Sequence, residues 1–394
     1  MNAVRAAKQI VDDPGADALE RLVARFDRSA FDIGRPIVRI RLQASETDRR
    51  DVVIKHGTAR LTDSRGSPDA VLSADLATWD EIAADVRGGM AAFRAGRLKI
   101  RRDLHLGVGF LAATAESTGP GRLRIRHLDT AAGGLSTIEA GTGDPVLMLH
   151  GLGATKASFL PTLAALAPSH RVIAVDLPGH GDSDKPLRAA YDAPFFAGAI
   201  VALLDALELE RAHVVGNSMG GRVGLELGLD HSDRVGRLVL LAPSLPWLKA
   251  RPWAPYLRLV PTQLGVLQPA PRVIVERIVK QFVPGSETGW TAAGIDEFMR
   301  SYLTRSGRAA FYAAARKIYL EEPRGPGGLW TRLGELTPEA LFVWGRQDTL
   351  VPIGFARHVR AEVPRATHLE LDCGHVPQLE RPRETHEAIK RFLA

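Results

Sequence analysis

Five short, almost unbroken apolar runs in the second half of the chain constrain its fold more than any other feature. They are PVLMLHG, RVIAVD, HVVG, RLVLLAP and ALFVWG, at residues 145–151, 171–176, 213–216, 237–243 and 340–345. Such runs are typical of strands that are buried on both faces of a parallel sheet. Helical stretches separate them. Strands that alternate with helices predict an α/β fold with a mostly parallel, doubly wound sheet.

One of these runs leads directly into GNSMGG, where Ser218 stands among glycines. A phosphate-binding loop would need Lys and then Ser or Thr after its glycines, and RVGLELG follows instead. The strand before the serine and the helix after it predict a sharp turn that lifts the hydroxyl above the sheet edge. Gly216, Gly220 and Gly221 would tolerate the strain and the close packing of such a turn. Ser218 is therefore the candidate nucleophile.

The sequence also supplies candidates for the groups that would activate this serine. A serine hydroxyl needs a base that takes its proton, and the base needs a group that fixes its tautomer. Asp348 follows the run ALFVWG, and His375 lies on a loop after a further short strand. Of the 12 histidines, His150 and His180 lie in other motifs and His386 in an amphipathic C-terminal helix. We therefore predict Asp348 and His375, and activity that falls at acid pH because the base must be neutral.

Residues 127–394 resemble the α/β-hydrolase family. The resemblance rests on HGLG, DLPGHGDSD, GNSMGG, WGRQD and GHVPQLERP, which occur in the family's order. It implies that the backbone N–H groups of Leu152 and Met219 bind the oxyanion, and that Asp176 and Asp182 organise the loop before the nucleophile. It further implies that five residues support these loops: His150, Gly151, Gly153, Gly216 and Gly220.

Residues 244–333, within this second domain, are too long for a simple crossover. They contain two stretches with a helical apolar stripe, at 273–283 and 307–320. We expect a helical lid over the nucleophile. Four of the six tryptophans fall within it, namely Trp247, Trp253, Trp290 and Trp330. An aromatic-rich cover favours an apolar acyl or alcohol group in the substrate.

The first 115 residues follow a different pattern. Residues 38–43 alternate apolar and polar side chains, residues 51–66 suit an antiparallel meander, and Trp79, Ile82 and Ala83 lie on one face of a helix. A second short helix, a strand at 98–101 and a closing apolar helix follow. Residues 116–126, rich in small and polar residues, are interpreted as a linker to the second domain.

The segment MAAFRAGRLKIRRDLHLG, residues 90–107, resembles the sterol carrier protein 2 (SCP2) family. The resemblance implies that residues 1–115 form a small α+β domain. In that family a mostly antiparallel sheet, covered by helices, surrounds an apolar tunnel for fatty acyl chains, acyl-CoA or sterols. Met90, Phe93, Leu98 and Ile100 are interpreted as ordinary core residues. Arg102 stands where many members of the family have glycine.

Composition excludes other classes. The single cysteine, Cys373, excludes an intramolecular disulfide and a multi-cysteine metal site, and we expect neither metal nor cofactor. The net charge is +6, but the basic residues are spread along the chain without a basic recognition helix, so no nucleic-acid partner is expected. No stretch has the roughly 18 apolar residues of a membrane span, and the first residues lack a signal-peptide pattern. We expect a cytoplasmic protein.

These features predict a serine carboxylic-ester hydrolase, esterase- or lipase-like, that acts through an acyl-enzyme on apolar or lipid-like esters. Three alternatives stay open: a C–C bond hydrolase of meta-cleavage products, an acyl-CoA thioesterase, and a lipid-binding carrier with a vestigial hydrolase. The C–C hydrolases also have GNSMGG and WGR-x-D, but usually HGxGPG where this chain has HGLGAT. The N-terminal domain is expected to bind a fatty acyl or sterol ligand or a lipid surface, or else to serve folding, solubility or dimerisation.

Overall fold

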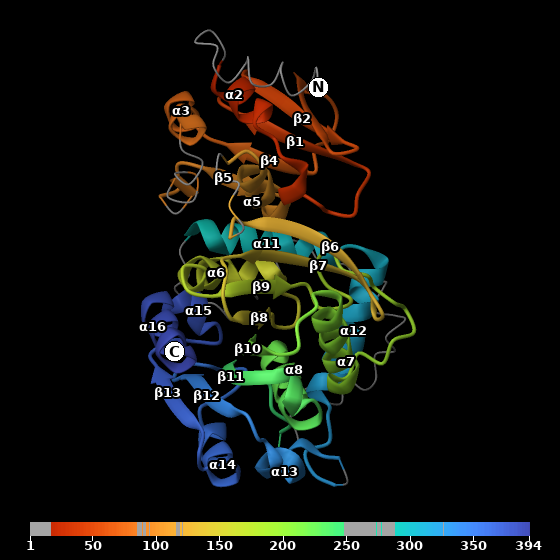
Figure 1. Cartoon of the computed structure of the whole chain (residues 1–394), viewed down its shortest axis with the longest axis vertical. Coiled ribbons are helices and arrows are strands. Elements are labelled where there is room, and N and C mark those ends of the chain that lie inside the picture. Colours follow the sequence, from red (N-terminus) through yellow and green to blue (C-terminus); the bar gives the residue numbers. More distant parts are fainter. Residues whose placement is uncertain are drawn as a thin grey trace. The chain divides into compact units, whose positions relative to one another are not determined.

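The structure is a computed structural model, shown in Figure 1. It describes residues 17–84, 89, 92–93, 95–115, 119, 121–247, 273, 277, 288–325 and 327–394. Apart from residues 273 and 277, the helix predicted over 273–283 lies outside what is described, as do the side chains of Met90, Trp253 and Trp290. Two compact units make up the chain. The first comprises Met1–His127 and Glu287–Glu297, and the second comprises Leu128–Ser286 and Phe298–Ala394.

The first unit contains a five-stranded sheet in the order β3-β2-β1-β4-β5. The strands are β1 (Ile37–Gln43), β2 (Arg49–Lys55), β3 (Thr58–Asp63), β4 (Ala70–Ser73) and β5 (Lys99–Arg101). Only the β1–β4 pairing is parallel. Val38, Ile40 and Leu42 are buried, as the alternating pattern predicts. The β2–β3 turn is formed by His56 and Gly57, both with positive φ, as in a tight hairpin.

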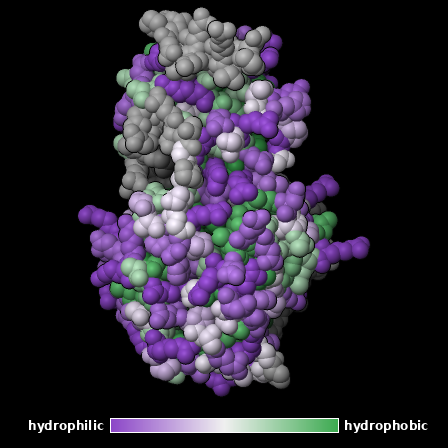
Figure 2. Space-filling view, in the orientation of Figure 1, coloured by the Kyte–Doolittle hydropathy of each residue, from purple (hydrophilic) through white to green (hydrophobic). Residues whose placement is uncertain are grey.

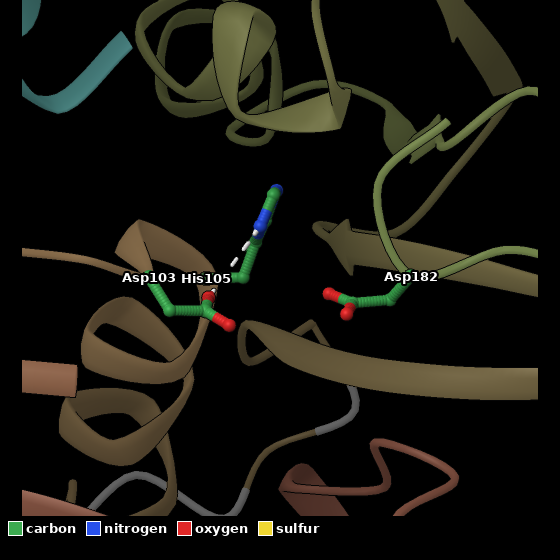
Figure 3. Close-up of side chains that lie close together, drawn as sticks. All are labelled: Asp103, His105 and Asp182. Atoms are coloured by element: carbon green, nitrogen blue, oxygen red, sulfur yellow. Dashed lines mark ion pairs between the residues drawn. The ribbon is translucent and has the colours of Figure 1, made fainter. Parts of the chain in front are cut away.

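Helices cover this sheet and bury its apolar residues. They are α2 (Ala18–Ala24), α3 (Leu76–Ala84) and α5 (Leu104–Ala113), with a short 3₁₀ turn, η1 (Arg28–Ala30). Trp79, Ile82 and Ala83 of α3 are buried, which confirms the predicted helical face. Figure 3 shows Asp103 and His105 at the start of α5, where the Asp103 carboxylate accepts a hydrogen bond from the Leu106 N–H at 3.0 Å. The antiparallel sheet and its helices form the α+β domain that the SCP2 resemblance implies.

Arg102, the residue that departs from the SCP2 pattern, forms the turn between β5 and α5. Its φ is 73°, in the left-handed region that favours glycine. The guanidinium turns back to the loop before β4, where Nη1 donates to Ser67 Oγ at 2.8 Å and to the Pro68 carbonyl at 2.5 Å. The chain therefore keeps the glycine-type backbone at this position and adds a side chain that bonds to the adjacent loop.

The second unit is built on an eight-stranded sheet in the order β13-β12-β11-β10-β8-β9-β7-β6. The strands are β6 (Arg124–Thr130), β7 (Gly133–Ala140), β8 (Pro145–Leu149), β9 (Arg171–Val175), β10 (Ala212–Asn217), β11 (Val235–Leu241), β12 (Glu339–Gly345) and β13 (Thr367–Leu371). From β9 to β13 every pairing is parallel, and β7 joins β9 antiparallel. The predicted mostly parallel sheet is confirmed.

Helices enclose both faces of this sheet, which explains why its central strands, β8 to β12, are largely apolar and buried. They include α6 (Leu160–Leu166), α7 (Ala193–Ala206), α8 (Met219–Asp230), α12 (Arg305–Tyr319), α13 (Leu329–Arg332), α14 (Phe355–Glu362), α15 (Pro377–Glu380) and α16 (Pro382–Leu393). A further helix, α11 (Thr288–Tyr302), belongs to the first unit as far as Glu297 and to the second unit from Phe298. One large core cluster joins Leu147 and Leu238 of the sheet to Ile200 of α7 and Val223 of α8. The alternate strand residues, such as Met148, are also buried.

The carboxyl ends of β8, β10, β11, β12 and β13 lie at one edge of the parallel sheet, and ligands of open α/β sheets bind at that edge. Ser218, Asp348 and His375 each follow one of these strands. On the surface shown in Figure 2, hydrophilic residues predominate and hydrophobic ones lie between them. Among the described helices, none is both long and apolar enough to cross a membrane.

Candidate active site

Ser218 forms the turn between β10 and α8. Its backbone has φ 53° and ψ −115°, which is unusual for a residue with a side chain. A Cβ on Gly216 would lie 2.3 Å from the Gly220 oxygen, and a Cβ on Gly220 would lie 2.0 Å from the Leu149 oxygen. Neither position accommodates a side chain, so the glycines allow the close approach that this strained turn requires. The Ser218 side chain is buried at the sheet edge.

Asp348 and His375 are brought together from the loops after β12 and β13. His375 Nδ1 lies 2.7 Å from Asp348 Oδ2. The other carboxylate oxygen, Oδ1, accepts hydrogen bonds from the Leu350 N–H at 2.8 Å and the Val351 N–H at 2.9 Å. When Nδ1 donates to the carboxylate, Nε2 of the neutral imidazole is the hydrogen-bond acceptor. This pair can therefore accept a proton at Nε2 and stabilise the imidazolium that results.

Asn217 ties the histidine loop to the nucleophile turn. Its side-chain amide donates to the Leu241 carbonyl at 3.0 Å and to the His375 carbonyl at 3.1 Å. The Ser218 N–H also donates to the Leu241 carbonyl, at 3.0 Å. The sequence analysis missed Asn217. Its position next to the serine within GNSMGG was the only signal available, because the partners are distant in sequence.

Ser244, in the loop after β11, provides a hydroxyl that sequence reasoning also missed. Its Oγ lies 3.3 Å from Ser218 Oγ, and both side chains are buried. Among the described residues, the Ser218 hydroxyl forms a hydrogen bond with Ser244 and none with His375. No motif indicated Ser244, since only the pairing of β10 with β11 brings it beside the serine.

The HGLG loop lies beside the serine. A Cβ on Gly151 would be 3.2 Å from Ser218 Cβ, and Gly153 has φ 73°. His150 is fully buried and accepts a hydrogen bond at Nε2 from the Leu177 N–H at 3.0 Å, so that Nδ1 donates to the Gly151 carbonyl at 2.8 Å. These bonds fix the start of the loop. The Leu152 side chain, only partly buried, packs against the core.

The DLPGHGDSD turn is held by a buried ion pair. Asp176 accepts a hydrogen bond from Lys156 Nζ at 2.5 Å and one from the Asp182 N–H at 2.9 Å. Its other oxygen accepts from the Lys156 N–H at 2.8 Å. Asp176 therefore connects the turn to the chain that follows HGLG. His180 within this turn is buried, and burial, together with the proximity of His150, lowers its pKa to about 3.

Cys373, two residues before His375, is buried. Burial raises the pKa of its thiol to about 12, so the thiolate that would react with oxidants or metals is disfavoured. This agrees with the interpretation of Cys373 as a small buried residue.

The described part of residues 244–333, the segment predicted to form a lid, places aromatic side chains against the HGLG loop. A Cβ on Gly153 would lie 2.8 Å from Phe298 and 3.0 Å from Phe311, and these two rings pack edge to face. Tyr302 stacks on Phe298. The buried Trp330 instead joins the two ends of the segment, because its indole N–H donates to the Pro246 carbonyl at 2.7 Å, and it stacks on Phe355 outside the segment. The predicted amphipathic stretch 307–320 falls almost entirely within α12.

The parallel sheet, the glycine-lined serine turn and the paired Asp348 and His375 define the architecture of an α/β hydrolase. The chain belongs to that family, because residues 144–382 match the family model described as alpha/beta hydrolase fold. Residues 19–111 match the SCP-2 sterol transfer family. The protein is thus an α/β-hydrolase enzyme that carries an SCP-2 domain before its hydrolase domain, as the two sequence resemblances predict.

Two bacterial relatives are similar over most of their own length. The 2-hydroxy-6-oxononadienedioate/2-hydroxy-6-oxononatrienedioate hydrolase of Cupriavidus pinatubonensis is 31% identical over 299 residues, which cover 70% of this chain and 92% of the relative. The 2-hydroxy-6-oxo-6-phenylhexa-2,4-dienoate hydrolase of Burkholderia cepacia is 28% identical, covering 65% of this chain and 90% of the relative.

Solved structures extend the comparison to enzymes of other types. A bacterial membrane phospholipase A is 25% identical with a TM-score of 0.59, over 69% of this chain and 86% of that one. The esterase EaEST of Exiguobacterium antarcticum is 21% identical with a TM-score of 0.57, over 68% of this chain and 98% of that one, and shows the shared fold. Enzymes of more than one substrate class therefore share this architecture.

Proposed function

We propose that the protein is a serine hydrolase that cleaves carboxylic esters of apolar acids or alcohols through an acyl-enzyme. The observation that carries the proposal is the 2.7 Å hydrogen bond between Asp348 and His375 at the sheet edge where the strained Ser218 turn lies. Ser218 is the proposed nucleophile, His375 the general base, and Asp348 the group that orients the imidazole.

The proposed reaction proceeds in two halves. In the first, Ser218 Oγ attacks the ester carbonyl while its proton moves to His375 Nε2, and the imidazolium then protonates the departing alcohol. In the second, His375 takes a proton from water, the resulting hydroxide attacks the acyl carbon, and the C–O bond to Ser218 breaks with return of the proton to Oγ. Asp348 stabilises the imidazolium in both halves, and no metal or cofactor is needed.

The negative oxygen of each tetrahedral intermediate requires hydrogen-bond donors. The backbone N–H groups of Leu152 and Met219 are proposed for this role. Met219 begins α8, so its N–H has no partner within the helix and adds the favourable field of a helix N-terminus. Leu152 belongs to the loop that approaches Ser218 at Gly151. His150 and Gly153 support this loop by the contacts described above.

The proposal of an apolar substrate rests on the aromatic side chains next to the HGLG loop. Phe298, Tyr302 and Phe311 form a continuous cluster of ring contacts, and Phe298 and Phe311 approach Gly153. Rings beside the donors for the oxyanion would contact the acyl or alcohol group of a bound ester. Such surfaces favour apolar over charged groups.

C–C bond hydrolysis is the second candidate, and the named relatives favour it. Their names describe 2-hydroxy-6-oxo dienoates, which contain no ester, so hydrolysis of such a compound must break the bond between a ketone carbon and its neighbour. The same Ser218, Asp348 and His375 could serve that reaction. HGLGAT in place of HGxGPG, together with the aromatic cluster, is the reason for placing esters first.

The deciding experiment offers both substrate classes to the purified full-length chain. It compares p-nitrophenyl esters from acetate to laurate with a vinylogous 1,5-diketone of the dienoate type, using the wild type and Ser218→Ala. Ester turnover that rises with chain length and is lost in Ser218→Ala is expected. Diketone cleavage with negligible ester turnover would replace the proposal by its second candidate, and turnover that survives in Ser218→Ala would refute both.

For the SCP-2 domain we propose a fatty acyl or sterol ligand, which would raise the local concentration of apolar substrate for the hydrolase domain. The buried, almost entirely apolar α5 and the apolar face of the sheet provide a suitable interior. Displacement of a fluorescent fatty acid from the full-length chain tests binding, with p-nitrophenyl acetate turnover measured alongside. Absence of binding would leave this domain a role in folding, solubility or association.

A further inference from the structure

The chain that leaves β11 wraps around the serine turn. The Ser218 N–H donates to the Leu241 carbonyl at 3.0 Å, and the Ser244 N–H donates to the Ser218 carbonyl at 2.9 Å. Both backbone polar groups of Ser218 are therefore bonded to this one segment.

Between these two bonds the segment itself is strained. Ala242 has φ 44°, a left-handed conformation that alanine rarely adopts, and its N–H donates to the Val343 carbonyl of β12 at 2.8 Å. Pro243 packs on the serine turn so closely that a Cβ on Gly221 would lie 2.8 Å from it. A strained loop that is bonded on both sides keeps the residue after it, Ser244, in a fixed place.

This arrangement fixes the position of the Ser244 hydroxyl. It lies 3.3 Å from Ser218 Oγ, and the side chains of Ser244 and Ser218 are 3% and 2% exposed. A buried hydroxyl needs a hydrogen-bond partner, and each of these serines provides one for the other. The hydrogen bond is therefore a property of the folded loop and does not depend on an exposed, rotating side chain.

We propose that Ser244 is a positioning residue for Ser218, a role that rests on the proposed nucleophilic function of Ser218. The Ser244 hydroxyl donates a hydrogen bond to Ser218 Oγ. The proton of Ser218 is then free to point toward His375 Nε2, and the lone pair that remains on Oγ attacks the substrate. Ser244 touches the nucleophile but exchanges no proton with it.

The same hydrogen bond assists when the acyl-enzyme breaks down. As the C–O bond to Ser218 breaks, its electron pair returns to Oγ, and the imidazolium of His375 supplies the proton. Negative charge develops on Oγ before that proton arrives, and a hydrogen bond from Ser244 stabilises it. Since the contact is present before and after acylation, its loss should lower kcat and leave substrate affinity unchanged.

The test uses Ser244→Ala, Ser244→Thr and wild type in the full-length chain. Two rates are measured: turnover of p-nitrophenyl butyrate, and covalent labelling by an alkyl fluorophosphonate, which reports on the serine whatever the natural substrate is. Loss of a neutral hydrogen bond should reduce kcat and the labelling rate about tenfold in Ser244→Ala, with KM within about twofold of wild type. Ser244→Thr, which retains the hydroxyl, should recover most of both rates.

Ser136→Ala is the matched control. Ser136 of β7 is an equally buried serine, 1% exposed, and within the described part of the chain its side chain makes no hydrogen bond to Ser218, Asp348 or His375. We expect wild-type rates from it. An unchanged or faster Ser244→Ala would overturn the inference, as would a loss confined to KM, or a Ser244→Thr as slow as Ser244→Ala.

The outcome also separates this inference from the function on which it rests. Ser218→Ala should abolish labelling and turnover, and if it does not, the proposed function fails first. If Ser218→Ala abolishes both while Ser244→Ala behaves like Ser136→Ala, the nucleophile stands and only the positioning role of Ser244 is lost.

Discussion

Each unit contains a strand-to-helix turn at which a residue with a side chain adopts left-handed backbone. In the first unit Arg102 has φ 73° between β5 and α5, and in the second Ser218 has φ 53° between β10 and α8. The Arg102 side chain bonds to the loop before β4, whereas Ser218 is buried among glycines beside another hydroxyl. Backbone strain alone does not define a reactive site. The difference lies in what surrounds the strained residue.

Removal of the Ser218 hydroxyl tests this contrast most severely. Ser218→Ala should lower kcat about 10⁶-fold, because the proposed nucleophile is removed, and it should leave the melting temperature nearly unchanged. Steady-state kinetics and calorimetry measure the two quantities. A residual rate within a hundredfold of wild type would mean that the turn at Ser218 is as inert as the turn at Arg102.

The second expected effect concerns the group that orients the base. Asp348→Asn should lower kcat about 10⁴-fold, because an amide that bonds to His375 Nδ1 favours the tautomer with its proton on Nε2. Steady-state kinetics, with Asp372→Asn as a matched variant of a nearby exposed carboxylate, provide the measurement. Equal losses in both variants would contradict the assignment.

The glycines around the serine allow a third test, this time of stability. A Cβ at Gly220 would lie 2.0 Å from the Leu149 oxygen, whereas a Cβ at Gly198 of α7 would meet no atom within 4 Å. Gly220→Ala should destabilise the protein by about 3 kcal/mol and inactivate it, since backbone atoms must shift. Gly198→Ala should be neutral or stabilising by comparison. Urea denaturation of both variants gives the result, and equal stabilities would show that the turn can relax.

A buried histidine gives the second unit a pH-dependent stability. His180 has its pKa lowered to about 3 by burial, whereas the unfolded chain titrates near 6.5. The folded state thus resists protonation, so its stability is complete above pH 6.5 and declines as the pH falls toward 3. As the pH falls from 7 to 5, protonation of this histidine in the unfolded chain lowers the free energy of unfolding by roughly 2 kcal/mol. Melting temperatures of His180→Gln should depend less on pH over that interval than those of wild type, and identical slopes would contradict the buried neutral state.

The smallest effect is expected at the turn of the first unit. Arg102→Gly relieves the left-handed strain but removes the bonds to Ser67 and Pro68, so the free energy of unfolding should change by no more than about 1 kcal/mol. Ester turnover should be unchanged. Chemical denaturation and kinetics provide the comparison with Ser218→Ala, and a large loss of activity would show that the two turns are more alike than their surroundings indicate.

Much of the fold could be predicted from the sequence because the burial of a strand depends on local sequence patterns. The alternation in β1 and the apolar runs of β8 to β12 each follow from which faces of a strand are buried. Ser218, Asp348 and His375 could be predicted because each lies shortly after a predicted strand and has a side chain suited to its role. That Asp348 and His375 form a hydrogen bond required the order of β12 and β13 in the sheet.

Other features were hidden because their partners are distant in sequence. Ser244 looks like any serine in a loop, and Asn217 bonds to carbonyls 24 and 158 residues away. The grouping of residues 287–297 with the first unit was not predicted either, since the helical stripe of a lid does not indicate what it packs against. In the first unit, Asp296 of this segment accepts a hydrogen bond from Arg101 Nε at 2.6 Å.

The Asn217 amide has a further consequence for how the enzyme would fail on heating. The histidine loop follows β13, which pairs with one neighbour only and lies at the edge of the sheet, where strands separate first. Asp348 and the Gln347 N–H, which donates to the Cys373 carbonyl, connect this loop to the chain after β12, and the Asn217 bond to the His375 carbonyl connects it to the central strand β10. Local fraying of β13 would therefore withdraw the base while the interior of the sheet is still intact, so that loss of catalysis precedes loss of fold.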